Sequence, residues 1–137
     1  MFMLLVKTKI GPSKIHGIGC FADQFIPKGT DVWRFQPGFD LEIDEGEIAN
    51  LSELAKEGFL RYTYLDRLTN KYIFCSDDDR FVNHSDNPNC INIYSFDGSH
   101  TSVAAKDIQE GEELTEDYEV YDANFESLDF VKVKFGT

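Results

Sequence analysis

Cysteine is scarce in this chain, and its placement excludes a disulfide framework. The three cysteines are Cys20, Cys75 and Cys90, an odd number with no CxxC pair, which indicates a reducing compartment. Cys75, His84 and Cys90 are potential metal ligands, but their spacing matches no structural zinc pattern and a fourth ligand is missing. We therefore expect thiols in the core or in turns, and no metal.

A hydrophobic run long enough to cross a membrane is also missing. The apolar opening MFMLLV is too short for a span, and it lacks the basic region and the cleavage site of a secretory signal peptide. We interpret it as a first strand. The protein is expected to be intracellular and to make no contact with a membrane.

Basic residues are also few. The chain has 13 Lys and Arg and 25 Asp and Glu, which gives a net charge of −12. From Asp107 to Asp129 the chain has no Lys or Arg. The acids of this acidic run are Asp107, Glu110, Glu112, Glu113, Glu116, Asp117, Glu119, Asp122, Glu126 and Asp129. Such a field repels nucleic-acid phosphates, so we expect no direct nucleic-acid binding, and it attracts basic partners. The alternative is a solvated surface that only aids solubility.

The sequence patterns that the chain does contain predict mainly short strands. The 137 residues, 42% of them hydrophobic, suffice for one packed domain, and no Gly/Ser linker divides the chain. The segment INIYSFDGSHTSVAA has two alternating runs joined through Asp97-Gly98, a typical hairpin turn pair. The stretches FADQFIPKG and VAAKDIQEG share the spacing of Ala, Ile and Gly. This echo predicts two equivalent units, each a strand and a tight turn led by Pro27-Lys28 or Gln109-Glu110.

One region has helical periodicity instead. The segment DEGEIANLSELAKEGFL places four apolar side chains on one helix face: Ile48, Leu51, Leu54 and Ala55. Asp44 and Glu47 have the spacing of a capping box. The expected fold class is therefore mainly β (β+α), with one short helical insertion at about 40–62.

Three motifs occur in a fixed order: GIGCFA…IPKG, RFVNHSDNPNC and AAKDIQEGEELTEDY. A GxG pair alone is a weak signal, and a run of Asn, Ser and Pro usually marks a surface turn. Together, however, the motifs resemble those of the SET-domain family of protein lysine methyltransferases, with its RFxNHSxxPN and GEELTxDY patterns. The resemblance covers about Lys9 to Tyr121, with core motifs at 14–22, 80–90 and 111–118. It predicts a SET domain over 1–121 and a C-terminal segment over 122–137.

The resemblance implies short strands with a pseudoknot, in which the NHS and ELTEDY segments thread together and form an S-adenosylmethionine pocket. A channel would lead from the pocket to the opposite face, where the substrate lysine enters. The residues matching the cofactor-binding positions are His16, Gly17, Ile18, Gly19, Arg80, Phe81, Asn83 and His84. Tyr118 matches the catalytic tyrosine, and Tyr62 and Tyr121 are candidates for the channel wall. Glu113 and Leu114 are interpreted as knot and core residues.

The chemistry that the resemblance implies is an in-line displacement, so the protein must align two groups and supply a neutral amine. An apolar channel and the positive sulfonium both disfavour the ammonium form, so no dedicated general base is required. Asn83 and the backbone of His84 would bind the methionyl amine and adenine, and the Tyr118 hydroxyl would lie at the inner end of the channel. Tyr62 shares a strand face with Tyr64, and core packing is an equal alternative for both.

The C-terminal segment departs from many members of this family. It contains no cysteine, so within these residues we expect no counterpart of the zinc-binding segment that closes the lysine channel in those members. Its apolar side chains predict a lid or a contact with a second subunit in a homodimer. In this respect the chain resembles the minimal stand-alone viral and bacterial members. The expected location is the cytoplasm or, for a viral or eukaryotic source, the host nucleus or chromatin.

The resemblance favours an S-adenosylmethionine-dependent protein-lysine N-methyltransferase, which releases S-adenosylhomocysteine. The acidic run predicts a basic protein as its substrate, such as a histone-like, ribosomal or nucleoid protein. The alternative is a non-catalytic module of the same fold that binds a basic protein through its acidic face. A third interpretation is a structural β domain whose motifs are turns, and a failure to bind cofactor would favour it.

Overall fold

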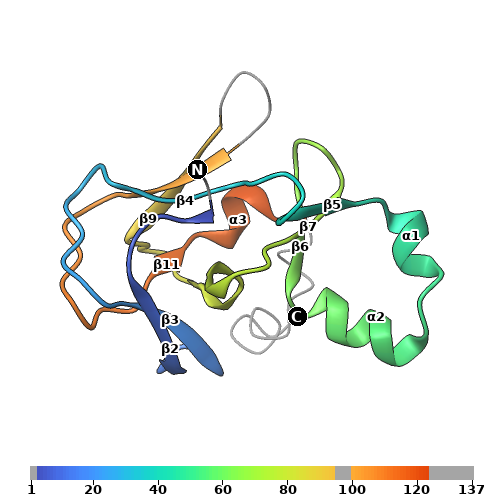
Figure 1. Ribbon diagram of the computed structural model, residues 1–137, viewed down its shortest axis with the longest axis horizontal. Coiled ribbons are helices and arrows are strands. Elements are labelled where there is room, and N and C mark those ends of the chain that lie inside the picture. Colours follow the sequence, from blue (N-terminus) through green and yellow to red (C-terminus); the bar gives the residue numbers. More distant parts are fainter. Residues whose placement is uncertain (1–2, 95–99, 124–137) are drawn as a thin grey trace.

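Short strands and short helices make up the computed structural model, which describes residues 3–94 and 100–123 (Figure 1). The first elements are β1 (Met3–Leu4), β2 (Thr8–Pro12), β3 (Ile18–Ala22), β4 (Asp31–Arg34) and β5 (Leu41–Ile43). The middle elements are α1 (Glu45–Ala49), α2 (Glu53–Leu60), β6 (Thr63–Leu65), β7 (Tyr72–Phe74) and the 3-10 helix η1 (Asp78–Phe81). The last are β8 (Asn83–His84), β9 (Cys90–Tyr94), β10 (His100–Ala104), β11 (Thr115–Glu116) and α3 (Tyr118–Tyr121).

Within these residues the strands form small sheets instead of one large sheet. A four-stranded antiparallel sheet has the order β1-β4-β10-β9, and an antiparallel three-stranded sheet has the order β5-β7-β6. β2 and β3 form an antiparallel hairpin, whereas β8 and β11 pair in parallel. The prediction of a mainly β fold of short strands is confirmed.

β9 and β10 pair antiparallel along their whole length, from Tyr94 opposite His100 to Cys90 opposite Ala104. This pairing confirms the predicted hairpin, whose Asp97-Gly98 turn lies outside the described residues. The apolar opening of the chain contributes a strand as predicted, although β1 is only two residues long.

The two echoing stretches, 22–29 and 104–111, lie against each other with an approximate two-fold relation. Ile26 and Ile108 exchange both backbone hydrogen bonds, at 2.9 and 2.8 Å, and both residues are fully buried. The glycine N–H that ends each stretch donates to the carbonyl of the alanine that begins the other, at 2.8 Å in both cases. The sequence echo therefore marks two strand-and-turn units that pair with each other.

Both units end in the predicted tight turn. Gly29 and Gly111 have φ angles of +89° and +93°. Each is the third residue of a turn whose closing N–H donates to Pro27 O at 3.2 Å or to Gln109 O at 3.1 Å. A positive φ at the third turn residue is the reason that glycine is needed at both places.

The insertion contains two helices, not the single helix predicted. α1 ends at Ala49, and Ser52 begins α2 by accepting a hydrogen bond from Ala55 N at 3.2 Å. Ser52 has an extended backbone, and its hydroxyl satisfies an N–H that a continuous helix would bond internally. Asp44 precedes α1, but its side chain makes no cap hydrogen bond, so the predicted capping box with Glu47 is wrong.

The apolar face predicted for this insertion is largely uncovered. Ile48 is 5% exposed, but Leu51 is 40% and Leu54 83% exposed, and α2 contains no buried residue. Phe59 attaches α2 to the sheet by stacking on Phe74, with ring centroids 5.4 Å apart. No helix in the described part of the chain is both long and apolar enough to cross a membrane.

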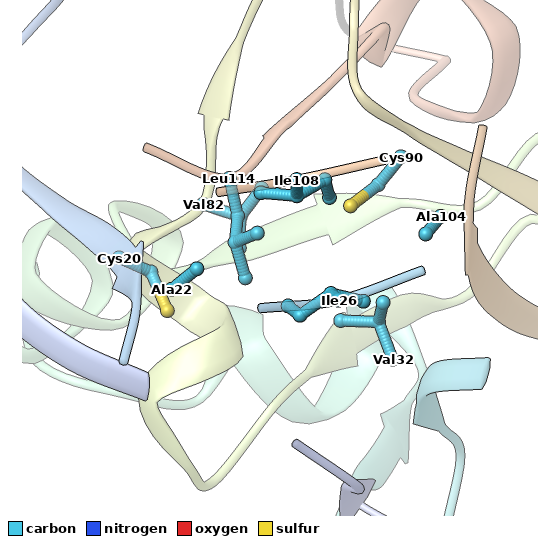
Figure 2. Packing of buried hydrophobic residues seen from close by; sticks show 9 residues of the cluster. All are labelled: Cys20, Ala22, Ile26, Val32, Val82, Cys90, Ala104, Ile108 and Leu114. Atoms are coloured by element: carbon cyan, nitrogen blue, oxygen red, sulfur yellow. The ribbon is translucent and has the colours of Figure 1, made fainter. Parts of the chain in front are cut away.

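The main core lies between the paired turn units and the strand that begins the NHS motif. Its buried members are Cys20, Ala22, Ile26, Val32, Val82, Cys90, Ala104, Ile108 and Leu114 (Figure 2). A second cluster consists of Trp33, Ile73 and Cys75, and the half-buried Tyr64 packs against it. Leu114 is thus a core residue as predicted, and Tyr64 takes the core-packing alternative.

All three cysteines are free and buried, which confirms the prediction of core thiols. Burial raises the pKa of the Cys20 thiol to about 12, so it is protonated and inert at neutral pH. Within residues 3–94 and 100–123, no cluster of His, Cys, Asp and Glu is arranged to hold a metal ion.

Candidate active site

The parallel pair of β8 and β11 brings the second and third motifs side by side. Thr115 lies opposite Asn83, and Glu116 lies opposite His84. Ser85 N extends the pairing by donating to Glu116 O at 2.9 Å. Parallel strands cannot be joined by a tight turn, and here the chain between them contains β9, β10 and the second turn unit. We use the term knot for β8, β11 and the residues whose side chains hydrogen-bond to these two strands.

Asn89, the last asparagine of the second motif, holds the third motif in place. Its Nδ2 donates to Glu113 O and its Oδ1 accepts from Thr115 N, both at 2.8 Å. The side chain, 8% exposed, thereby substitutes for the backbone of a neighbouring strand. No role was predicted for Asn89, and the available signal was its place within a matched motif.

Asn83 connects the knot to the turn between β2 and β3. Its Nδ2 lies 3.0 Å from His16 O and 3.3 Å from Ile18 O. The same nitrogen lies 2.9 Å from Glu113 Oε2 and 3.2 Å from Ser13 Oγ, so four acceptors share two hydrogens. The two chain segments predicted to bind the cofactor, which are distant in sequence, therefore meet at Asn83.

Ser13 and Glu113 complete this junction. Ser13 Oγ lies 2.8 and 2.9 Å from the two carboxylate oxygens of Glu113. Gly19 packs so closely against them that a Cβ there would lie 2.5 Å from Glu113 Oε2. Gly17, with φ of +50°, has open space where its Cβ would be. Glu113 is a knot residue as predicted, whereas sequence reasoning gave Ser13 no role.

Tyr118 is attached to the segment around β8 at both of its ends. Its backbone N donates to His84 Nδ1 at 3.0 Å, and its hydroxyl donates to Val82 O. Burial raises the pKa of the Tyr118 phenol far above its ordinary value, and the charges of Glu116 and Asp79 add to the shift. The phenol is therefore a neutral hydrogen-bond donor at physiological pH.

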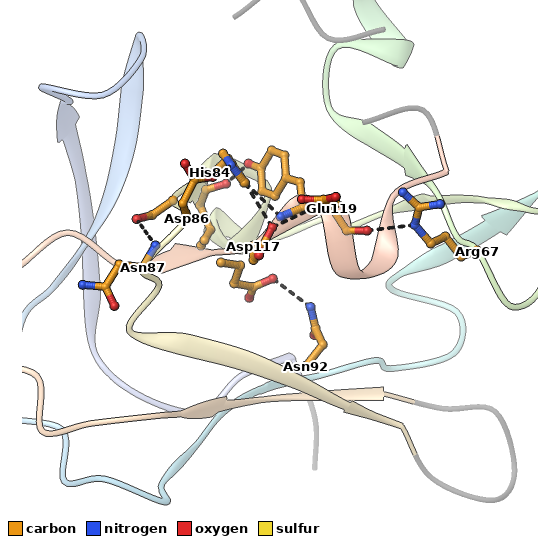
Figure 3. A network of polar contacts seen from close by, with 11 residues as sticks. Arg67, His84, Asp86, Asn87, Asn92, Asp117 and Glu119 are labelled. Atoms are coloured by element: carbon orange, nitrogen blue, oxygen red, sulfur yellow. Dashed lines mark hydrogen bonds and ion pairs between the residues drawn. The ribbon is translucent and has the colours of Figure 1, made fainter. Parts of the chain in front are cut away.

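The helix that begins with Tyr118 is held from its other side by β6 and the loop after it. Leu65 N donates to Asp122 Oδ1 at 3.3 Å, and Ala123 N donates to Leu65 O at 2.7 Å. Arg67 Nε donates to Glu119 O at 2.9 Å (Figure 3). α3 is thereby fixed between the knot and the three-stranded sheet.

Arg80 and Phe81 of the second motif form a cluster with Tyr62. The rings of Tyr62 and Phe81 meet edge to face, with centroids 5.7 Å apart. The Arg80 guanidinium carbon lies 4.6 Å from the Phe81 centroid and 5.9 Å from that of Tyr62, while Nη1 donates to Ser76 O at 3.1 Å. Tyr62 is 38% exposed. The other channel candidate, Tyr121, ends α3, and its side chain lies outside the described residues.

Glu116 and Asp79 are the two acids whose charges act most strongly on the Tyr118 phenol. Glu116, 5% exposed, accepts hydrogen bonds from Ser102 Oγ at 2.7 Å and Asn92 Nδ2 at 3.0 Å. The Oδ1 atom of Asp79 is buried without a hydrogen-bond partner. Burial, with the charges of Glu116 and Asp77, raises the pKa of Asp79 well above its ordinary value.

The acids of the acidic run differ in how far they are exposed to solvent. Its exposed members are Asp107, Glu110, Glu112 and Glu119. Glu116 and Asp122 are buried and accept hydrogen bonds, while Glu126 and Asp129 lie outside the described residues. The described part of the chain therefore exposes fewer acidic side chains to a partner than the ten acids of the run imply.

Comparison with known proteins identifies the family. A profile described as the SET domain matches residues 17–119, a range that contains the NHS segment, the knot and Tyr118. This chain belongs to the SET-domain family. The resemblance of the motifs is thereby confirmed.

Relatives and solved structures agree with this assignment. The H3 lysine-4 specific histone-lysine N-methyltransferase of Schizosaccharomyces pombe is 32% identical over 123 residues, which cover 79% of this chain. The H3 lysine-36 specific enzyme of Mycosarcoma maydis is 31% identical over 128 residues, or 84% of this chain. This chain spans only 12% of either relative. A humanized mutant of Chaetomium thermophilum Polycomb Repressive Complex 2, bound to an inhibitor, matches the fold with a TM-score of 0.63 and 21% identity, over 89% of this chain and 16% of that one.

Proposed function

We propose that this chain is an S-adenosylmethionine-dependent protein-lysine N-methyltransferase, with its site where the β2–β3 turn, β8 and α3 meet. The placement of Tyr118 is the main observation that supports the proposal. Its backbone N–H and its phenol are both hydrogen-bonded to the segment that also contacts the turn through Asn83. A tyrosine kept only for packing needs neither polar attachment.

The groups at this junction fit the chemistry of the cofactor. An amino-acid ammonium needs oxygen acceptors, and no described residue donates to Asn83 Oδ1, so this atom is available for that contact. An adenine ring needs an apolar face, which Phe81 beside Tyr62 would offer. Gly17 leaves the turn backbone uncovered by a side chain. We therefore expect the turn and the start of β8 to hold the cofactor.

Tyr118 and its neighbours would prepare the substrate amine. A bound cofactor would supply a methyl group on a positive sulfur. The sulfur would keep the electron pair of the broken bond, and the methylated amine would release a proton to water. The Tyr118 oxygen can accept a hydrogen bond from the amine while its own O–H donates to Val82 O. Burial raises the pKa of Asp79 well above its ordinary value, which reduces the negative charge that would favour the ammonium form.

The substrate class that we propose is a basic protein, with histone H3 as the first candidate because two relatives are named for it. The exposed acids Glu110, Glu112 and Glu119 would increase the association rate of a lysine-rich peptide. Replacing all three by Gln should lower kcat/KM and weaken its dependence on salt, because screening acts on exposed charges. An unchanged salt dependence would contradict the role of these acids.

Cofactor binding tests the placement of the pocket. Asn83→Ala should weaken S-adenosylmethionine binding by about tenfold or more, because a half-buried polar partner is lost. The matched control is Asn87→Ala, because Asn87 is exposed and the structure uses its backbone N–H. Calorimetry that gives wild type and Asn83→Ala the same affinity would contradict this placement. A wild type without affinity would favour a non-catalytic or structural domain.

A further inference from the structure

His84 combines a backbone in β8 with an imidazole that the proposed cofactor contact does not use. We propose that the His84 imidazole is a positioning residue for Tyr118, holding the first N–H of α3 through Nδ1. This inference rests on the proposed function and deepens it, because it assigns the support of the catalytic tyrosine to a named side chain. Of the His84 side chain, 8% is exposed, so the contact is shielded from water.

The first N–H groups of a helix have no partner within the helix. In α3 two of them are satisfied by side chains. Asp117 Oδ1 accepts from Glu119 N at 3.0 Å, and His84 Nδ1 accepts from Tyr118 N at 3.0 Å. Since the phenol of Tyr118 is also bound, to Val82 O, the contact with His84 fixes the second end of the residue. Losing it would leave the phenol attached at one end.

The hydrogen-bond directions determine which nitrogen of His84 carries the proton. A backbone N–H can only donate, so Nδ1 accepts and has no proton. The ring proton is therefore on Nε2, which lies 2.9 Å from Asp86 Oδ1 and donates to it (Figure 3). Asp86 thus selects the form of the imidazole that can hold Tyr118.

Protonation of His84 would remove this support. An imidazolium has hydrogens on both nitrogens, so Nδ1 could no longer accept from Tyr118 N. Asp117 Oδ1 lies 3.7 Å from Nδ1, and the centroids of the His84 and Tyr118 rings are 5.5 Å apart.

Two substitutions distinguish the two nitrogens. In Asn the side-chain oxygen is attached to Cγ, as Nδ1 is, so His84→Asn keeps an acceptor for Tyr118 N. In Gln the amide lies one bond further out, so His84→Gln keeps a polar group only near the Asp86 side. Both variants are neutral and polar, so a role in packing or solubility does not separate them.

Single-turnover methyl transfer to histone H3, with cofactor affinity measured by calorimetry, is the first readout. His84→Gln should lower the rate by about tenfold or more while cofactor affinity changes little, because the phenol is misplaced. His84→Asn should recover most of that loss. Equal losses in both variants, or losses explained by weaker cofactor binding, would overturn the proposal.

Amide exchange measured by NMR separates failure of this inference from failure of the proposed function. The Tyr118 N–H should exchange slowly in wild type and His84→Asn and quickly in His84→Gln, whether or not the chain transfers a methyl group. Slow exchange in wild type without any transfer would support the positioning contact and refute the enzyme. Equal exchange in all three proteins would refute the contact itself.

Discussion

The knot and the helical insertion are built in opposite ways within one small chain. In the knot, the side chains of Asn89 and Glu116 are buried and hydrogen-bonded to other segments. In the insertion, α2 has no buried residue, and Leu54 is 83% exposed. Figure 1 shows α1 and α2 at the right end of the view and β2 and β3 in its left half.

This difference indicates which part of the fold needs a unique arrangement. A buried polar network is stable in one geometry, because each unsatisfied group is costly in a low-dielectric interior. A helix that contributes few buried contacts can shift or open at little cost in free energy. The groups proposed for catalysis lie in the first region. We therefore expect substitutions in the knot to have larger effects than the same substitutions in the insertion.

The largest contrast in stability should come from truncating one leucine in each region. Leu114→Ala removes a fully buried side chain and should lower the free energy of unfolding by about 3 kcal/mol. Leu54→Ala on α2 should change it by less than about 0.5 kcal/mol. Urea unfolding measures both. Similar losses at the two positions would mean that the insertion is covered in solution.

An asparagine pair tests the polar part of the knot. Asn89→Ala leaves Thr115 N and Glu113 O without the partner that binds them and should cost about 2 kcal/mol. Asn50→Ala, at the exposed end of α1, is the matched change in the insertion and should be nearly neutral. Thermal unfolding that ranks the two equally would refute the structural role of Asn89.

A glycine pair should give effects of opposite sign. A Cβ at position 19 would lie 2.5 Å from Glu113 Oε2, so Gly19→Ala should destabilise by about 1–2 kcal/mol. Gly58, inside α2, has open space around it, so Gly58→Ala should stabilise by about 0.5–1 kcal/mol through helix propensity. Chemical denaturation of both variants tests this. A stabilising Gly19→Ala would show that the turn does not pack against Glu113.

The smallest contrast is a dependence on pH. Asp79 keeps its proton in the folded chain above its ordinary pKa of 3.8, whereas the unfolded chain releases it there. The folded state then binds more protons, so stability falls as the pH rises through this range. Asp79→Asn should remove that fall, and its stability advantage over wild type should widen from pH 4 to pH 8. Glu57→Gln, on the exposed side of α2, is the control that should show no widening.

The sequence predicted the local structural units of the fold better than the contacts between them. The echoing units were predicted as equivalent turns, because the glycines and their spacing are local signals. Their pairing through Ile26 and Ile108 could not be predicted, because no local pattern specifies which strands will meet. The break at Ser52 was missed for the opposite reason. The apolar spacing of Leu51 and Leu54 indicates one helix, and a local hydroxyl overrides it.

The candidate site also combines features that the sequence predicted with features that it did not. The meeting of the cofactor segments was implied by the resemblance, and Asn83 with His16 and Ile18 places them in contact. Ser13 and Asn89 were missed because their roles depend on distant partners that the sequence does not reveal. The roles assigned to the cofactor-binding residues and to Tyr118 in turnover stay predictions.

The most direct test of the central claim is the transfer of labelled methyl from S-adenosylmethionine to histone H3 and other basic proteins, measured by mass spectrometry for wild type and Tyr118→Phe. We expect wild type to modify specific lysines. Tyr118→Phe should retain cofactor affinity and lose about 100-fold or more of the single-turnover rate, because the hydroxyl that holds the amine is gone. A variant that transfers at the wild-type rate would contradict the account and remove Tyr118 from the mechanism.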